Sequence, residues 1–324
     1  MNKEFNRRQL GTALRLGLSV ALLALLFSRI DFGQLIGHLL SLHLGYYALG
    51  LACYFGFIGL WAARWRFILQ AAGEQVGFRR VFMTTLVGNF FALFLPEVVG
   101  SDLARMHEVS SERRASAAIV STVLLDRVVG LASIVLMALV ALVVGSRYLE
   151  DPAIGLTLGG LLALFVVGWR LFFERRFMNW WFDRLFRLAR RFEGRIRNLY
   201  EALYHLHEQP RLLAGSLILA LLVQVVEVVS VILIARAMDV QAAPGYFFIF
   251  LPLIWMVTAL PVSLSGLGVR EGAFAFFFTQ VGVAASEAVA MSLLYYSFRV
   301  ITGLVGGLAF LKGSAERYLA AQRT

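Results

Sequence analysis

The sequence is a succession of long hydrophobic runs separated by short polar segments. A helix that crosses a bilayer needs roughly 20 apolar residues, and several runs approach or exceed that length. They are residues 12–28, 46–69, 80–95, 115–146, 153–173, 212–236, 245–262, 272–283 and 288–311. Some of these runs are too short, or too closely followed by a break, to cross fully. The pattern therefore predicts an all-α polytopic integral membrane protein in which not every helix crosses.

Two of the hydrophobic runs are interrupted by a proline, and the two interruptions resemble each other. In residues 95–105 a Leu-Pro pair is followed by eight residues and then Arg105, and residues 260–270 lead to Arg270 with the same spacing. The copies are 165 residues apart in a chain of 324. A helix can break inside a bilayer only where its freed backbone groups face protein or water. Two such breaks in corresponding halves indicate a transport-type site near the bilayer midplane.

The distribution of lysine and arginine predicts the orientation, because cytoplasmic loops are enriched in both. Basic residues near the start of the chain place the N-terminus inside. If the run 80–95 crossed the membrane, Arg105 would lie outside together with Arg113 and Arg114. A re-entrant hairpin over residues 80–113 removes this conflict, and a second hairpin over residues 245–283 then enters from the opposite face. The sequence thus predicts about six full crossings, two re-entrant broken-helix hairpins and cytoplasmic N- and C-termini.

These segments are expected to form a single membrane domain, residues 1–324, built as an inverted repeat. The first repeat is predicted over residues 46–147 and the second over residues 210–312. A shorter echo supports the repeat, because Asp126-Arg127 after the first hairpin resembles Phe298-Arg299 after the second. Between the repeats, a cytoplasmic basic amphipathic helix is expected over residues 175–208.

The composition agrees with this interpretation. Hydrophobic residues make up 60% of the chain and charged residues 15%, with a mean hydropathy of +0.76. The net charge of +10 owes much to nine arginines within residues 170–197, where apolar side chains recur every three or four positions. A basic helix with an aromatic stripe binds anionic lipid surfaces, and no nucleic-acid motif accompanies it, so we expect no nucleic-acid partner. Cys53 is the single cysteine, which excludes an intrachain disulfide and a cysteine metal cluster.

Ionisable residues inside the hydrophobic runs are the candidate functional residues, because each costs about 2.5 kcal/mol or more at the bilayer centre. They are Glu97, Asp102, Arg105, Asp126, Arg127, Glu227, Arg270, Glu271 and Arg299. Arg105 and Arg270 follow the breaks, where the start of a half-helix and a guanidinium both favour a phosphate or carboxylate. Gly266 and Gly268 either let the backbone approach such a headgroup or simply turn the chain. The alternative for both arginines is structural pairing or snorkelling to the interface.

The other buried charges have two interpretations each. Arg127 and Arg299 lie deep in their spans, where they either line a polar cavity for the headgroup or form static ion pairs between the repeats. Glu227 either couples a proton to transport or neutralises an arginine, and Asp126 is likewise a coupling or ion-pair carboxylate.

Neighbouring charges are expected to pair across helices. Asp126 and Arg127 are adjacent, as are Arg270 and Glu271, and adjacent side chains point in different directions on a helix. Asp102 and Glu271 are placed with the arginines in the predicted headgroup site.

Aromatic and basic residues in and after the second span are expected at the membrane interface or in the cytoplasm. Trp61, Trp65, Tyr46 and Tyr47 suit an interfacial belt. Arg64, Arg66, Arg79 and Arg80 are expected to reach the cytoplasm.

The sequence carries no nucleophile elbow, no phosphate-binding glycine loop followed by lysine and no paired catalytic carboxylates in a soluble domain. Its five histidines show no metal spacing. We therefore expect a non-enzymatic protein with no cofactor and no metal site. The candidate partners are membrane lipids with anionic headgroups, lipid-synthesis enzymes and a second copy of the chain.

With these motifs the chain resembles the flippase-like membrane domain of lysylphosphatidylglycerol synthases, the multiple peptide resistance factors, whose stand-alone relatives include hopanoid-associated membrane proteins. The resemblance covers nearly the whole chain and is most specific at residues 266–272; Ser101 stands where the family commonly has a glycine. It implies that the two hairpins form a site for moving a phosphate-bearing lipid between leaflets of the bacterial cytoplasmic (inner) membrane.

Two other functions stay open. The chain could be a non-translocating accessory protein of lipid-linked glycan or hopanoid assembly, or a transporter of ions or small solutes. The aminoacyl-transferase domain of the family would follow the membrane part, and this chain ends at Thr324. We therefore do not expect it to aminoacylate lipids.

Overall fold

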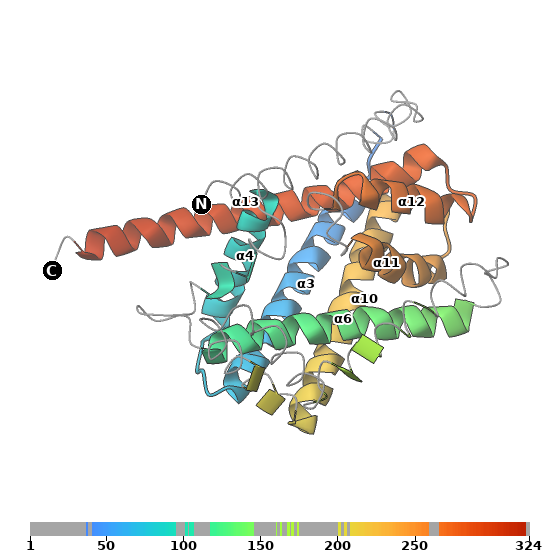
Figure 1. Cartoon of the computed structure of the whole chain (residues 1–324). Coiled ribbons are helices and arrows are strands. Elements are labelled where there is room, and N and C mark those ends of the chain that lie inside the picture. The colour runs from blue at the N-terminus through green and yellow to red at the C-terminus, as the bar shows by residue number, and fades with distance from the viewer. Residues whose placement is uncertain are drawn as a thin grey trace, which may run out of the picture. The chain divides into compact units, whose positions relative to one another are not determined.

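The described part of the computed structural model consists of helices joined by turns and short connections. The described part comprises residues 37, 41–94, 101–102, 104–106, 117–145, 210–258 and 266–321, with isolated positions between 160 and 209. Its helices are α3 (Leu44–Ala71), α4 (Phe78–Phe94), α6 (Ala117–Gly145), α10 (Pro210–Ala237), α11 (Pro244–Thr258), α12 (Val269–Thr279) and α13 (Ala285–Ala321) (Figure 1). No strand occurs in these residues, which confirms the all-α prediction for the described part.

Four of the described helices are long and apolar enough to cross a membrane. They are Leu44–Ala71, Ile119–Val140, Pro210–Ala237 and Ala285–Lys312. The predicted spans at 12–28 and 153–173, and the basic helix at 175–208, lie wholly or largely outside the described residues.

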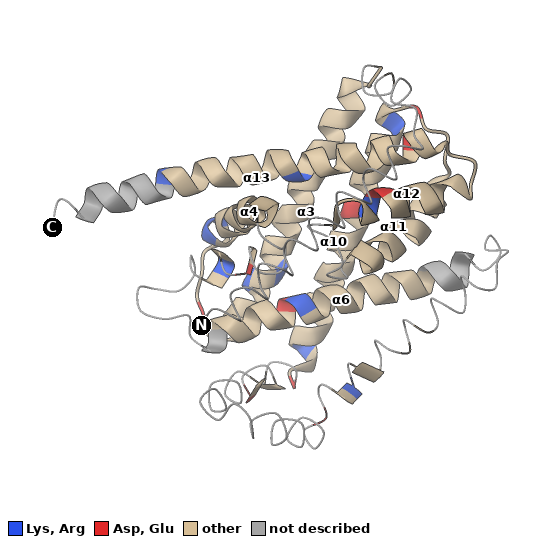
Figure 2. Ribbon diagram, turned by 45° about the horizontal axis from the view of Figure 1, so that its top comes forward, with Lys and Arg blue, Asp and Glu red and all other residues tan. Residues whose placement is uncertain are grey.

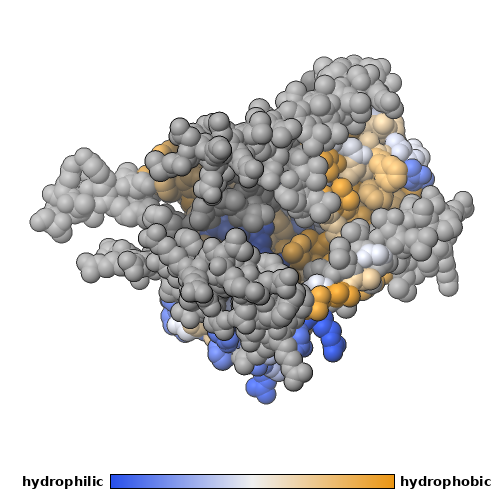
Figure 3. All heavy atoms as spheres, in the orientation of Figure 1, coloured by the Kyte–Doolittle hydropathy of each residue, from blue (hydrophilic) through white to orange (hydrophobic). Residues whose placement is uncertain are grey.

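Large apolar side chains are exposed on all four of these helices. Leu49, Leu131, Ile218 and Leu308 are examples. Figure 3 shows broad hydrophobic areas where described atoms are visible on this face. Soluble monomers rarely expose large contiguous apolar patches, whereas side chains that contact acyl chains must be apolar. The structure is therefore that of a multi-pass membrane protein.

The chain divides into two compact units, which are described separately. Unit 1 comprises Met1–Phe57, Leu86–Ser101 and Val225–Thr324, and unit 2 comprises Ile58–Thr85 and Asp102–Gln224. Helices α3, α4 and α10 each contribute residues to both units. The predicted repeat boundaries stay a prediction.

In unit 1 the chain doubles back after α4. A β-carbon added at Gly88 of α4 would stand 3.1 Å from the carbonyl oxygen of Ser101 and 3.2 Å from its hydroxyl. Thirteen residues separate the two positions in sequence, so the chain must reverse direction between them. The first proline break, residues 95–100, lies outside the described residues.

Helices α11 and α12 also form a hairpin in unit 1. The rings of Phe247 and Phe250 on α11 lie 4.9 and 5.5 Å from the ring of Phe278 on α12. Near the other end of the pair, a β-carbon at Gly266 would stand 3.6 Å from Thr258. With 15 and 11 residues, the helices are about 22 and 16 Å long, which is shorter than the roughly 30 Å hydrocarbon core of a bilayer. The second break, residues 259–265, lies outside the described part.

Helix α13 packs on α4 through a stripe of glycines in unit 1. Gly303, Gly306 and Gly307 of α13 face Leu93, Leu86 and Phe90 of α4, in that order. A β-carbon at Gly306 would stand 2.0 Å from the carbonyl oxygen of Leu86, so the two backbones are in direct contact. Small residues allow this approach between helices in membranes, where close packing drives association.

Unit 2 is held together by two clusters of buried apolar side chains. One contains Ile68, Leu125, Val129, Leu212 and Ala220. The other contains Ala62, Trp65, Leu69, Val81, Ile119 and Val123. Asp126 lies on α6 between positions that belong to these clusters, so the apolar core surrounds the polar residues described next.

Candidate functional site

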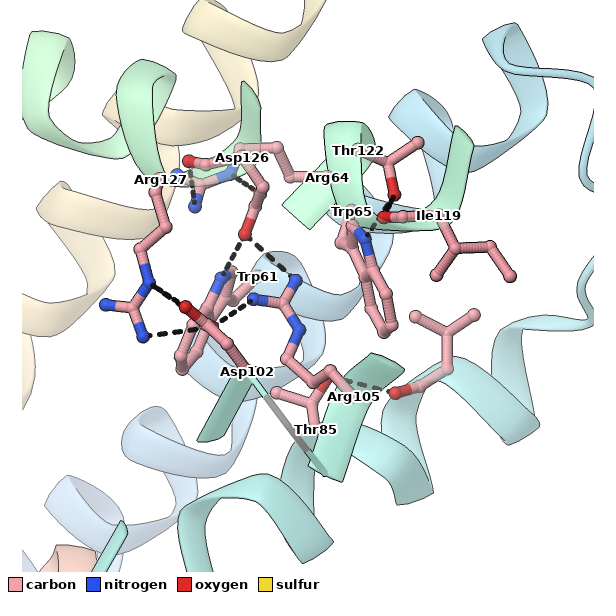
Figure 4. A network of polar contacts seen from close by, with 11 residues as sticks. Trp61, Arg64, Trp65, Thr85, Asp102, Arg105, Ile119, Thr122, Asp126 and Arg127 are labelled. Atoms are coloured by element: carbon pink, nitrogen blue, oxygen red, sulfur yellow. Dashed lines mark hydrogen bonds and ion pairs between the residues drawn. The ribbon is translucent and has the colours of Figure 1, made fainter. Parts of the chain in front are cut away.

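Asp126 is the centre of a buried polar network in unit 2. Its side chain is 1% exposed, and its two oxygens accept hydrogen bonds from Arg64 Nε at 2.7 Å, Arg105 Nη2 at 2.9 Å and Trp61 Nε1 at 2.9 Å. Helix α3 supplies Arg64 and Trp61, while the segment 101–106 supplies Arg105 (Figure 4). Figure 2 shows an acidic and a basic segment side by side on α6, which is otherwise uncharged. A buried carboxylate is tolerated when cations and hydrogen bonds compensate it as fully as here.

Arg105 is fully buried and lies against two indole rings. Its guanidinium carbon is 4.0 Å from the ring centroid of Trp65 and 5.2 Å from that of Trp61. Such cation–π contacts stabilise a desolvated guanidinium. Among the described residues, Arg105 Nε and Nη1 have no hydrogen-bond partner. Buried donors without an acceptor raise the free energy of the folded state. These two nitrogens can therefore donate to a further oxygen ligand.

Asp102 and Arg127 form the second ion pair of the network. Arg127 Nε donates to Asp102 Oδ2 at 3.0 Å and Nη2 donates to Oδ1 at 3.0 Å, which is a bidentate arrangement. Asp102 Oδ1 is also 3.8 Å from Nη1 of Arg105. The Arg127 side chain is 28% exposed and that of Asp102 11%, whereas Arg64 and Arg105 are at 5% or less. This pair is therefore the accessible side of the network.

The network carries an excess of positive charge. Three arginines (Arg64, Arg105 and Arg127) face two aspartates (Asp102 and Asp126), which gives a net charge of +1 among these described residues. Guanidinium groups bind phosphate and carboxylate oxygens in pairs, and Arg127 presents its guanidinium at the accessible side of the network. The arrangement is suited chemically to recognition of a monoanion.

In unit 1, Arg270 and Glu271 pair with each other, so the prediction that they pair across helices is wrong. Glu271 Oε2 accepts a hydrogen bond from the Gly268 N–H at 2.7 Å, which folds the carboxylate back over the start of α12. Its Oε1 then meets the Arg270 guanidinium, whose Nε also donates to Ser292 Oγ at 3.1 Å. The guanidinium lies 4.6 Å from the ring centroid of Tyr296. This charge pair is buried and neutral.

The prediction of pairing across helices is confirmed for Asp126 and Arg127. Asp126 binds Arg64 and Arg105, and Arg127 binds Asp102, so neither contacts its sequence neighbour through these ion pairs. Because Arg105 belongs to unit 2 and Arg270 to unit 1, their convergence on one site stays a prediction.

The glycines at the start of α12 turn the chain. Gly266 and Gly268 have φ angles of 77° and 82°, which residues with a side chain rarely adopt. Of the two interpretations of these glycines, the geometry supports the turn.

Glu227 of α10 accepts a hydrogen bond from the hydroxyl of Tyr295 on α13. Both side chains are buried, and the ring of Tyr54 packs edge-on against Tyr295 at 5.7 Å. Arg299, one turn further along α13, is half-buried. Tyr295 is therefore one partner of Glu227, which the sequence did not indicate.

Three residues of the network were assigned elsewhere from the sequence. The sequence suggests an interfacial belt for Trp65 and the cytoplasm for Arg64, whereas the structure buries both side chains, which are 0% and 4% exposed. Trp61 likewise contacts the network through its indole N–H. The spacing of these residues could have indicated their common location, because positions 61, 64 and 65 share one face of a helix. An arginine and two indoles inside an apolar run therefore form one polar and aromatic surface.

Apolar helices of spanning length, with ion pairs buried between them, define a polytopic α-helical membrane protein. The family model for the lysylphosphatidylglycerol synthase transmembrane region matches residues 12–307. The chain therefore belongs to the lysylphosphatidylglycerol synthase transmembrane family, and its role in the membrane is related to lipids. Comparison with curated proteins and with solved structures gave no match.

Proposed function

We propose that this chain is a lipid flippase that binds a phosphate-bearing headgroup, anionic or zwitterionic, at the polar network of unit 2. The observation that carries the proposal is the group of three arginines among apolar helices, two of them buried and the third, Arg127, the most accessible. Ionisable groups at membrane depth commonly mark a substrate pathway, and the fork of a guanidinium matches phosphate oxygens. The lipid is bound and moved without covalent change, so the chain acts as a carrier and not as an enzyme.

The proposed carrier has six crossings and two re-entrant hairpins that are related as an inverted repeat. The reversal of the chain between Gly88 and Ser101 and the shortness of α11 and α12 support the hairpins. Transporters of this build alternate access by rocking one repeat against the other. The location we propose is the bacterial cytoplasmic membrane, with both termini inside.

The topology can be tested by labelling single cysteines from either side of the membrane in a Cys53→Ala background. We expect Arg79→Cys, in the exposed first turn of α4, to react with an impermeant maleimide from the cytoplasmic side. Gly245→Cys and Gln280→Cys, at the exposed ends of α11 and α12, should both react from the outer side. Labelling of all three positions from one face would contradict the inverted arrangement.

Lipid movement can be tested in proteoliposomes that contain fluorescent phosphatidylglycerol. Arg105→Gln and Arg127→Gln should each slow headgroup transfer at least about tenfold, which corresponds to 1.4 kcal/mol. The fold should survive both changes, because each leaves two arginines facing two aspartates. Transfer is measured as loss of dithionite-accessible fluorescence.

The control for this assay is Arg236→Gln, which removes an exposed arginine at the end of α10 and should leave transfer unchanged. Full activity of both network variants would contradict the site assignment. Lipid that co-purifies with the wild-type chain but stays in its leaflet would favour the accessory role instead.

A further inference from the structure

We infer that the carboxylate of Asp102 is an internal stand-in for the anionic headgroup. It binds the guanidinium of Arg127 when no lipid is bound. A bound lipid phosphate displaces it, and the carboxylate then binds the guanidinium of Arg105. The inference rests on the proposed function, because it takes the ligand of the network to be an anion. It assigns Arg127 as the residue that contacts the phosphate and Asp102 as the residue that sets the affinity.

The contact between Asp102 and Arg127 has the geometry of a bound anion. Two nitrogens of the guanidinium donate to the two carboxylate oxygens at 3.0 Å each, which is the two-point arrangement that arginine also offers to a phosphate. The two residues come from different elements, the 101–106 segment and α6, so their pairing is not imposed by a shared helix. A phosphate at Arg127 would take the place of this carboxylate.

Arg105 offers the displaced carboxylate a second position. Its Nη1 lies 3.8 Å from Asp102 Oδ1 and has no hydrogen-bond partner among the described residues. Asp102 and Arg105 are three positions apart in one helical segment, a spacing at which side chains meet without backbone movement. Rotation of the Asp102 side chain between staggered rotamers is therefore enough to close the gap.

The other aspartate of the network is unsuited to such an exchange. Asp126 is held by Arg64, Arg105 and Trp61 together and is 1% exposed. Asp102, at 11% exposure, has one bidentate partner, and that partner is the most accessible arginine of the network.

The inference predicts that removing the charge of Asp102 strengthens lipid binding. Asp102→Asn keeps the size of the side chain and one acceptor oxygen but no longer competes with the phosphate as an anion. In the 324-residue chain, we expect the Kd for dihexanoyl phosphatidylglycerol to fall about tenfold. Isothermal titration measures the Kd, and tryptophan fluorescence reports on Arg105 through the adjacent Trp61 and Trp65.

Two matched variants complete the experiment. Asp239→Asn makes the same chemical change in an exposed turn and should leave the Kd unchanged. In an Arg127→Gln background, Asp102→Asn should give no gain, because there is then no guanidinium for which to compete. This double-mutant cycle isolates the coupling between the two side chains.

The outcomes separate the inference from the proposed function. Saturable binding that Arg127→Gln weakens but Asp102→Asn leaves unchanged or weakens would overturn the stand-in role of Asp102 alone. If the wild type and all variants show no saturable binding of phosphatidylglycerol, the anionic-lipid site fails, and the inference fails with it. A gain in Asp102→Asn that persists in the Arg127→Gln background would also overturn the exchange.

Discussion

Replacing Asp126 by alanine should destabilise the protein by about 3–5 kcal/mol, the range measured when one partner of a buried ion pair is removed. The change would leave the fully buried Arg105 and the nearly buried Arg64 without their shared carboxylate, and the indole N–H of Trp61 without its acceptor. Removing this carboxylate also adds repulsion between the arginines that it separates. Thermal unfolding of the purified protein in detergent, followed by intrinsic fluorescence, measures the loss.

Asp102→Ala provides the comparison for this prediction. It also removes one carboxylate from the network, but its partner Arg127 is 28% exposed and can turn toward water or lipid headgroups. We therefore expect a loss below the range of about 3–5 kcal/mol given for Asp126→Ala, because the arginine left behind keeps some access to its surroundings. Equal destabilisation by the two changes would show that Asp126 has no special structural role.

A compensated variant separates the charge effect from packing. Arg64→Met, Arg105→Met and Asp126→Leu together remove all three buried charges while keeping similar volumes. Replacing a buried ion cluster by apolar residues is often neutral or stabilising, so this variant should recover most of the stability lost in Asp126→Ala while remaining inactive in lipid transfer.

The helices could be predicted from hydropathy because a bilayer makes unusually strict demands on composition. The hydrophobic run 46–69 predicts the helix that the structure shows as α3, Leu44–Ala71. The run 212–236 likewise predicts α10, Pro210–Ala237. The end of α13 was missed, since the prediction stopped at residue 311 and the helix continues to Ala321. That last segment carries Lys312, Glu316 and Arg317, which favour a helix but lower its hydropathy, so a search for apolar runs cannot find it.

The candidate residues of the network could be found from the sequence, but their partners could not. Charges in apolar runs are conspicuous, and Asp102, Arg105, Asp126 and Arg127 were selected on that ground. Which arginine contacts which carboxylate depends on how the helices pack, and the network joins residues of α3, of α6 and of the segment 101–106. The sequence therefore could not indicate that Arg64 shares Asp126 with Arg105.

The pairing of Arg270 with Glu271 had a local signal that was overlooked. Glu271 is the third residue of α12, and a glutamate at that position often accepts a hydrogen bond from the backbone N–H of the residue that caps the helix. Gly268 is that residue. Once the carboxylate folds back to cap the helix, it can reach the adjacent guanidinium, and the general rule that sequence neighbours diverge no longer applies.

Gly306→Leu should prevent α13 from packing on α4, which makes it the second change with a large expected effect. Even a β-carbon at this position would stand 2.0 Å from the Leu86 carbonyl oxygen and 2.9 Å from the Val87 nitrogen. Backbone atoms cannot rotate away as a side chain can, so the helices must separate. We expect Gly306→Ala to cost at least the upper end of the roughly 1–3 kcal/mol typical of overpacking, and Gly306→Leu to abolish a folded, monodisperse product in detergent chromatography.

Two other glycine-to-alanine substitutions serve as controls for the loss of stability expected at Gly306. Gly303→Ala should be milder, because the atom it meets at 2.7 Å is a terminal carbon of the Leu93 side chain, which can adopt another rotamer. Gly272→Ala on α12 meets no atom within 4 Å and should be neutral or stabilise by up to about 1 kcal/mol, because alanine favours a helix more than glycine does. A Gly306→Ala protein as stable as the Gly272→Ala protein would show that the two backbones are not in contact. Helix α13 also carries Ser292 and Tyr295, which form hydrogen bonds with Arg270 and Glu227. Separation of α13 from α4 should therefore weaken both of these buried hydrogen bonds as well.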